Sequence, residues 1–144
     1  MRYASFQCLD CLLETIPNSI PSLSDFMRHL SNGITDSDYG IQMLTYGMLY
    51  KTAGIYGEKM TQFLDLLPVF LMKGIKGKLK EATKREYDNE GAKDVLIQAC
   101  KALYALNQLP NINNARKFVT FYSRVEKTKV LIPMLNELKN ASNN

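Results

Sequence analysis

The chain has 144 residues, 46% of them hydrophobic and 22% charged, with a net charge of +4. This length and this balance fit one folded domain and exclude an intrinsically disordered chain. The N-terminus lacks the apolar segment of a secretory signal, and no apolar run reaches the about 20 residues of a membrane span, so the three cysteines predict reduced thiols in a cytoplasmic protein.

Helical periodicity, interrupted by proline and glycine, runs along the chain, and no strand pattern is present. We predict a single all-α domain over residues 1–144, folded as a compact helical bundle of five to seven helices. Its long helices are expected near residues 4–15, 22–33, 38–53, 58–72, 78–87, 92–109 and 114–132. Pro68 should kink or shorten the fourth of these, and residues 73–77 should form a loose connection. No repeat of about 20–50 residues is visible, so a solenoid is not predicted.

Charge is divided unevenly along the chain. Residues 1–72 carry four basic and seven acidic side chains, a net charge of −3. Residues 73–144 carry fourteen basic and seven acidic side chains, a net charge of +7. Because a chain polarised in this way presents an electrostatic field to its surroundings, the basic half predicts an acidic partner.

Glycine recurs at seven-residue spacing in the third predicted helix, at Gly40, Gly47 and Gly54. Glycine costs a helix about 1 kcal/mol relative to alanine, so three glycines on one helix face need a compensating gain. The gain could be close helix packing inside the domain. The alternative is a face that docks a partner or a second copy, and the sequence leaves both interpretations open.

A stripe of lysines is the main candidate for function. It comprises Lys73, Lys76, Lys80 and Lys84, flanked by Lys78 and Arg85. The spacing places the four lysines of the stripe on one helix face, where like charges repel one another. Phosphates of a nucleic-acid backbone would relieve this repulsion and gain affinity through counterion release. A solvated face, an acidic protein and an anionic lipid surface are the alternatives.

A second basic group lies on the last long helix, at Lys117, Arg124 and Lys127. Aromatic side chains interleave with it, a mixture that suits single-stranded nucleic acid. Phe118 and Phe121 stand at core spacing, which leaves only Tyr122 as a candidate for base stacking.

No catalytic, metal or cofactor site is predicted. Cys8 and Cys11 form one pair, but zinc needs four ligands, and the only other candidates, Cys100 and His29, do not form a second pair at zinc-finger spacing. A Ser–His or Cys–His dyad would depend on the single histidine, and no phosphate-binding loop is present. We therefore expect that the chain is not an enzyme.

Two sets of short segments resemble known families. Tyr50-Lys51-Thr52-Ala53-Gly54, followed by Phe63-Leu64, resembles the small helical subunits of CRISPR effector complexes. That resemblance implies a subunit of an RNA-guided antiviral complex that lines the nucleic-acid path. Lys84-Arg85-Glu86 and Gly91-Ala92-Lys93 resemble the matrix protein of influenza-type viruses, which implies a helical shell protein that touches RNA and membrane.

These observations predict a non-enzymatic, basic helical subunit of a larger nucleoprotein assembly. The predicted nucleic-acid-binding residues are Lys73, Lys76, Lys80, Lys84, Arg85, Lys117, Arg124 and Lys127. Contacts to the backbone position a nucleic-acid strand but do not distinguish its base sequence. The alternative is a protein–protein adaptor that docks through the Gly40, Gly47 and Gly54 face, or a matrix-type shell protein. The sequence does not decide whether the two basic helices form one surface.

Overall fold

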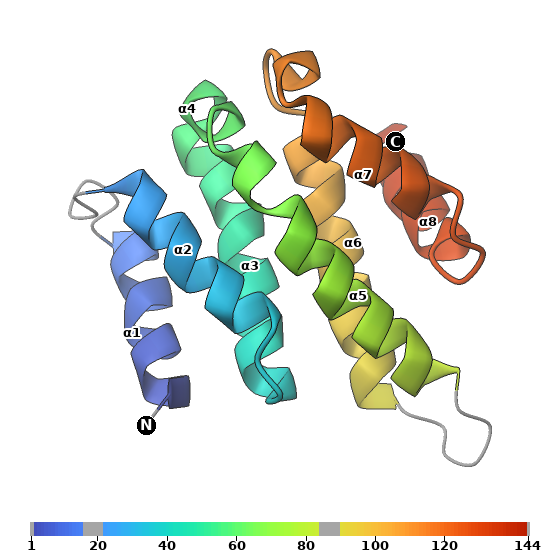
Figure 1. Cartoon of the computed structure of the whole chain (residues 1–144), viewed down its shortest axis with the longest axis horizontal. Coiled ribbons are helices and arrows are strands. Elements are labelled where there is room, and N and C mark those ends of the chain that lie inside the picture. Colours follow the sequence, from blue (N-terminus) through green and yellow to red (C-terminus); the bar gives the residue numbers. More distant parts are fainter. Residues whose placement is uncertain (1, 16–21, 84–89, 144) are drawn as a thin grey trace.

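A computed structural model describes residues 2–15, 22–83 and 90–143 of the chain (Figure 1). All regular secondary structure in these ranges is helical, which confirms the predicted all-α class. The α-helices are α1 (Arg2–Thr15), α2 (Leu23–Ile34), α3 (Tyr39–Tyr56), α4 (Glu58–Thr61), α5 (Pro68–Ala82), α6 (Glu90–Asn107), α7 (Arg116–Glu126) and α8 (Ile132–Asn143). Two short 3₁₀ helices join them, η2 (Leu64–Leu66) and η3 (Ile112–Asn114). Within the described ranges this is one α-helix more than the most that was predicted.

The long helices alternate between two layers along the chain. In Figure 1, α2, α5 and α7 form the front layer, and α1, α3, α6 and α8 lie behind it. The extensive contacts join neighbours within a layer, such as α3 with α6, and consecutive helices across the layers, such as α5 with α6. This is the arrangement of α-solenoids rather than of a bundle closed around one axis. Stacked helix pairs need only matching apolar faces and no repeated sequence. The absence of a visible repeat therefore led the sequence-based prediction away from this arrangement.

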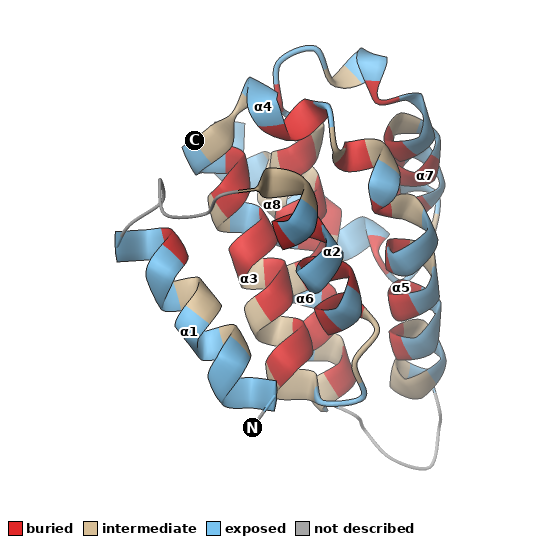
Figure 2. Cartoon of the chain, turned by 60° about the vertical axis from the view of Figure 1, so that its left-hand side comes forward, coloured by how far each residue is buried: buried red, intermediate tan, exposed pale blue. Residues whose placement is uncertain are grey.

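The core lies where the two layers meet. Figure 2 shows α3 buried along most of its length, whereas α1 is largely exposed and buries only Leu13. The apolar stripe of α6, which consists of Val95, Leu96, Ala99, Leu103 and Leu106 at helical spacing, is buried. Phe118 and Phe121 are also core residues, as predicted. Tyr122 is buried as well, so the interpretation of its ring as a stacking platform was wrong.

The segment around Pro68 differs from the prediction. Helix α3 ends at Gly57, whose φ of +53° suits glycine, and the single turn of α4 and η2 follow it. Pro68 then opens α5, because the first helical position needs no N–H donor and favours the fixed φ of proline. Residues 73–77 lie inside α5 and are not a loose connection. The break between the fourth and fifth predicted helices therefore lies just before Pro68 and not at residues 73–77.

A close approach between α2 and α5 explains one glycine inside α5. A Cβ atom on Gly74 would lie 2.9 Å from the carbonyl oxygen of Ile34 and 2.9 Å from its Cγ2. Only glycine permits this contact at the end of α2. The stabilisation gained by packing two helices together offsets the poor helix propensity of glycine.

The N-terminus of α7 is held from another part of the chain. Neither Asn113 nor Asn114 caps α7, because both lie in η3, and Ala115 at the N-cap offers no side-chain acceptor. Asp65 in η2 accepts a hydrogen bond from the backbone N–H of Phe118 at 3.1 Å instead. A carboxylate at this end also complements the helix dipole. This contact fixes α7 relative to the start of α5.

None of the helices in the three described ranges is long and apolar enough to cross a membrane.

Candidate functional site

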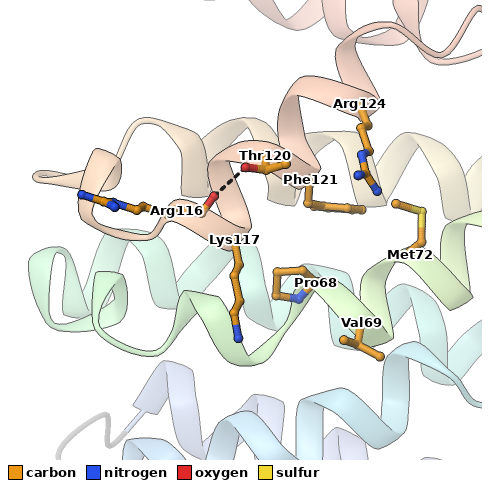
Figure 3. A pocket seen from close by; sticks show the side chains of 8 residues that line it. All are labelled: Pro68, Val69, Met72, Arg116, Lys117, Thr120, Phe121 and Arg124. Atoms are coloured by element: carbon orange, nitrogen blue, oxygen red, sulfur yellow. Dashed lines mark hydrogen bonds between the residues drawn. The ribbon is translucent and has the colours of Figure 1, made fainter.

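A surface groove of about 560 Å³ lies between α5 and α7. Its lining residues are shown in Figure 3: Pro68, Val69, Met72, Arg116, Lys117, Thr120, Phe121 and Arg124. The first turns of α5 supply one wall, and the exposed side of α7 supplies the other. The two helices belong to the same layer, so the groove opens on the outer face of the array.

The floor of the groove is apolar. Pro68, Met72 and the edge of Phe121 meet there, and Val69 is 78% exposed beside them. Leu66 and Phe70, which flank Pro68 and Val69 in the chain, are exposed apolar side chains as well. Scattered apolar side chains are normal on a protein surface, but a contiguous apolar patch with a polar rim is typical of an interaction site.

The rim of the groove is basic. Arg116, Lys117 and Arg124 are exposed side chains of α7, and Figure 3 shows Arg124 reaching toward Met72 and Lys117 running past Pro68. Within the described residues, no carboxylate lies within 4.0 Å of these three cations. The positive charge of the rim is therefore not neutralised by that part of the chain.

The predicted lysine stripe continues from the apolar floor along α5. Lys73, Lys76 and Lys80 are exposed and follow Val69 at helical spacing, so they share its face. Lys84 and Arg85 lie outside the described residues. The two basic helices are thus neighbours in one layer, and the structure brings Lys117 and Arg124 to the start of α5. Lys127, at the C-cap of α7, is exposed but does not line the groove.

Lys78 does not belong to the exposed basic surface. Its side chain is buried against Tyr39 at the start of α3, and the residue is 5% exposed. The ammonium group lies 3.0 Å from both carboxylate oxygens of Glu81 and 4.2 Å above the ring of Tyr39. Tyr39 also donates a hydrogen bond to Glu81. Lys78 therefore ties the start of α3 to α5, and its treatment as a flank of the stripe was wrong.

The three spaced glycines of α3 have different surroundings. A Cβ atom on Gly40 would meet the ring of Tyr3 at 2.9 Å, so this position allows α1 to pack closely. Among the described residues, no atom lies within 4 Å of a Cβ placed on Gly47 or Gly54. Packing inside the chain therefore accounts for Gly40 alone, and a docking role for the face stays a prediction.

Gly54 lines a second groove, of about 450 Å³, between the ends of α3 and α6. Tyr50 stands at its edge, half exposed, with the ammonium group of Lys101 5.6 Å from the ring centroid. Lys51, which lines this groove, is engaged by Asp10 at 2.7 Å and by Glu14. Burial lowers the pKa of Lys51, but these hydrogen bonds outweigh it, so the pKa is raised overall. The second groove thus has less unneutralised charge than the first.

No metal site emerges in residues 2–15, 22–83 and 90–143, where no group of three or more His, Cys, Asp or Glu side chains could hold an ion. Cys8 and Cys11 are exposed free thiols. Cys100 is buried in the core, and burial raises the pKa of its thiol to about 12, so it stays protonated at neutral pH.

Comparison with known proteins identifies the family. The sequence model of the TIP120 family, described as TATA-binding protein interacting (TIP20), matches residues 1–126. The chain belongs to this family. A TIP120 match of this length covers seven of the eight described α-helices, from α1 to α7, and includes both walls of the groove.

Two curated relatives are similar over almost the whole chain. Cullin-associated NEDD8-dissociated protein 1 of Drosophila melanogaster is 30% identical over 139 residues, which is 96% of this chain and 10% of that protein. The protein of the same name from Dictyostelium discoideum is 25% identical over 142 residues, 96% of this chain and 11% of that protein. The chain thus spans about a tenth of the length of these relatives. No solved structure matches the chain significantly.

TIP120 membership corrects the functional hypotheses drawn from short segments. The resemblance to CRISPR effector subunits was wrong, since the TIP120 match runs through Tyr50–Gly54 and Phe63–Leu64. The resemblance to viral matrix proteins fails for the same reason. The prediction of a nucleic-acid-binding, antiviral ribonucleoprotein subunit was therefore wrong as well. Its lysine stripe adjoins an apolar groove, a combination better suited to a protein than to a phosphate backbone.

Sequence reasoning missed the apolar half of the site. Val69 and Met72 were included in a predicted helix that ended before the lysines, so their shared face with Lys73 and Lys76 was not recognised. If Pro68 had been taken as the start of a helix, Val69 and Met72 would have been placed on one helix with the lysines, because proline is favoured at the first helical position. Arg116 lines the groove only because α5 and α7 pack side by side, an arrangement that no local sequence signal shows.

Proposed function

We propose that this chain is a non-enzymatic protein-docking module that binds a cullin as part of a longer helical array. The similarity along 96% of the chain to two proteins named as cullin-associated carries this proposal. Those relatives are about ten times longer, which supports a role as one segment of an extended array. The chain would act in the cytoplasm, where its three thiols stay reduced.

The geometry supports binding rather than catalysis. The helices lie side by side in two packed layers, and each layer leaves a long outer face available to a partner, as in helical-repeat proteins. The larger groove combines an apolar floor with a charged rim, which is the usual composition of a protein interface. This corresponds to the adaptor alternative drawn from the sequence. Gly47, which is half-buried, and Gly54, which is exposed, offer a further surface for the same role.

The proposal is tested by measuring the affinity of the purified chain for an immobilised cullin by biolayer interferometry. The relatives are named NEDD8-dissociated, so we expect a cullin without NEDD8 to bind and the same cullin conjugated to NEDD8 to bind more weakly. TATA-binding protein is the second analyte, because the family description names it.

The possible outcomes separate the partners. Saturable binding to unmodified cullin supports the proposal. Binding to TATA-binding protein alone would keep the docking role but replace the partner. No binding to either protein, at concentrations of the folded chain up to about 100 μM, would contradict the proposal, since interfaces of ordinary size give micromolar or tighter affinity.

A further inference from the structure

We propose that the groove between α5 and α7 binds an acidic amphipathic helix of a protein partner, with its apolar side chains on the groove floor and its carboxylates on the basic rim. The inference rests on the proposed function only in taking the ligand to be a protein. It does not depend on that protein being a cullin. Shape, charge and the exposure of the floor each contribute to the argument.

The shape of the groove suits a helix. Two helices of one layer form its walls, and α5, with 15 residues, is about 22 Å long. The volume of about 560 Å³ is open along the outer face rather than enclosed. A helix laid between two others buries one face at regular spacing, which is the helix-in-groove mode of peptide recognition.

Charge selects an acidic ligand. An apolar partner that covered Arg116, Lys117 and Arg124 would take three cations out of water without a counter-ion, which is costly. Carboxylates on the flanks of the incoming helix would pair with them. Beyond the groove, Lys73, Lys76 and Lys80 prolong the positive surface along α5, so acidic residues that follow the helix would also find partners.

The floor favours a protein over a nucleic acid. Phosphates could pair with the rim, but bases would need an exposed aromatic face on which to stack. Phe121 is only 4% exposed and presents its edge, and the remaining floor residues, Pro68, Val69 and Met72, are aliphatic. Leucine or phenylalanine side chains of a helix would pack against this floor and bury its apolar surface, whereas a nucleic-acid backbone offers no apolar groups to pack there.

The test uses a synthetic, fluorescein-labelled helical peptide of about 15 residues, a length that matches α5. Leucines stand at positions i, i+3, i+4 and i+7, and glutamates flank them. One control peptide replaces the glutamates by glutamine, and a second replaces the leucines by alanine. Fluorescence anisotropy with the full chain should show saturable binding of the first peptide and, for each control, binding weaker by roughly tenfold or more.

Variants of the chain locate the binding. The double variant Lys117→Glu/Arg124→Glu and the single variant Val69→Asp should each reduce affinity for the acidic peptide roughly tenfold. All three positions are solvent-facing, so the fold should persist, and thermal unfolding checks this. Lys59→Glu is the matched control, because Lys59 is exposed and lies outside the groove. It should leave the affinity unchanged.

Equal binding of all three peptides would overturn the inference, and so would an unchanged affinity in the Lys117→Glu/Arg124→Glu and Val69→Asp variants. Absence of peptide binding would overturn it too, while leaving cullin binding intact as a separate result. Conversely, if the chain binds the peptide but fails to bind cullin, the inference about the groove stands and the proposed partner is refuted.

Discussion

At the scale of single residues, two glycines of α5 illustrate how position decides the effect of one methyl group. Gly74 faces the end of α2, where an added Cβ would lie 2.9 Å from a backbone oxygen that cannot rotate away. We expect Gly74→Ala to lower the free energy of unfolding by about 1–3 kcal/mol, because the two helices must move apart. Urea denaturation followed by circular dichroism measures this change.

Gly77 supplies the matched control in the same helix. In the part of the chain that the structure describes, no atom lies within 4 Å of a Cβ at this position, and the residue is exposed. Alanine there removes backbone entropy from the unfolded chain, so Gly77→Ala should raise the free energy of unfolding by about 0.5–1 kcal/mol. Equal effects of the two substitutions would refute the close contact between Gly74 and Ile34.

At the scale of elements, the hydrogen bond from the Phe118 N–H to Asp65 connects η2 to α7. Asp65→Ala removes both the acceptor and the charge at the helix N-terminus. We expect it to lower the free energy of unfolding by about 1 kcal/mol, as for the loss of other N-caps. Asp65→Asn keeps an acceptor, so its effect should be smaller.

The same substitution has a local readout. Hydrogen exchange of the Phe118 amide, measured by NMR, should become faster in Asp65→Ala and change less in Asp65→Asn, because this amide loses its acceptor only in the first variant. If the exchange of this amide is the same in the unmodified chain and in Asp65→Ala, then Asp65 does not hold α7.

Elements were predictable from the sequence where their pattern is local. The stripe of α6 and the core positions Phe118 and Phe121 follow from helical periodicity alone. The division at Pro68 was missed because an internal proline predicts a kink, although proline also favours the start of a helix. The burial of Lys78 depends on Tyr39 and Glu81, and the contact with Tyr39 is a tertiary one that no periodicity shows.

At the scale of the whole molecule, the all-α class followed from the sequence but the layered arrangement did not. Which faces of α5 and α7 meet depends on packing between helices separated by more than thirty residues. The basic character of both helices was visible, and the apolar floor between them arose only from their juxtaposition. Charge by itself suggested phosphate, whereas charge beside an apolar groove, together with TIP120 membership, supports the proposal of a protein partner.

The proposal that this chain docks a protein and not a nucleic acid is tested most directly by hydrogen–deuterium exchange. Exchange is measured for the chain alone, for the chain with a cullin that lacks NEDD8, and for the chain with a single-stranded oligonucleotide. Amides in an interface exchange more slowly when the partner is bound. We predict that saturating cullin slows exchange in one contiguous set of helices that includes α5 and α7, and that the oligonucleotide at near-physiological salt leaves exchange unchanged. Unchanged exchange with cullin, or slower exchange with the oligonucleotide in its place, would contradict the account.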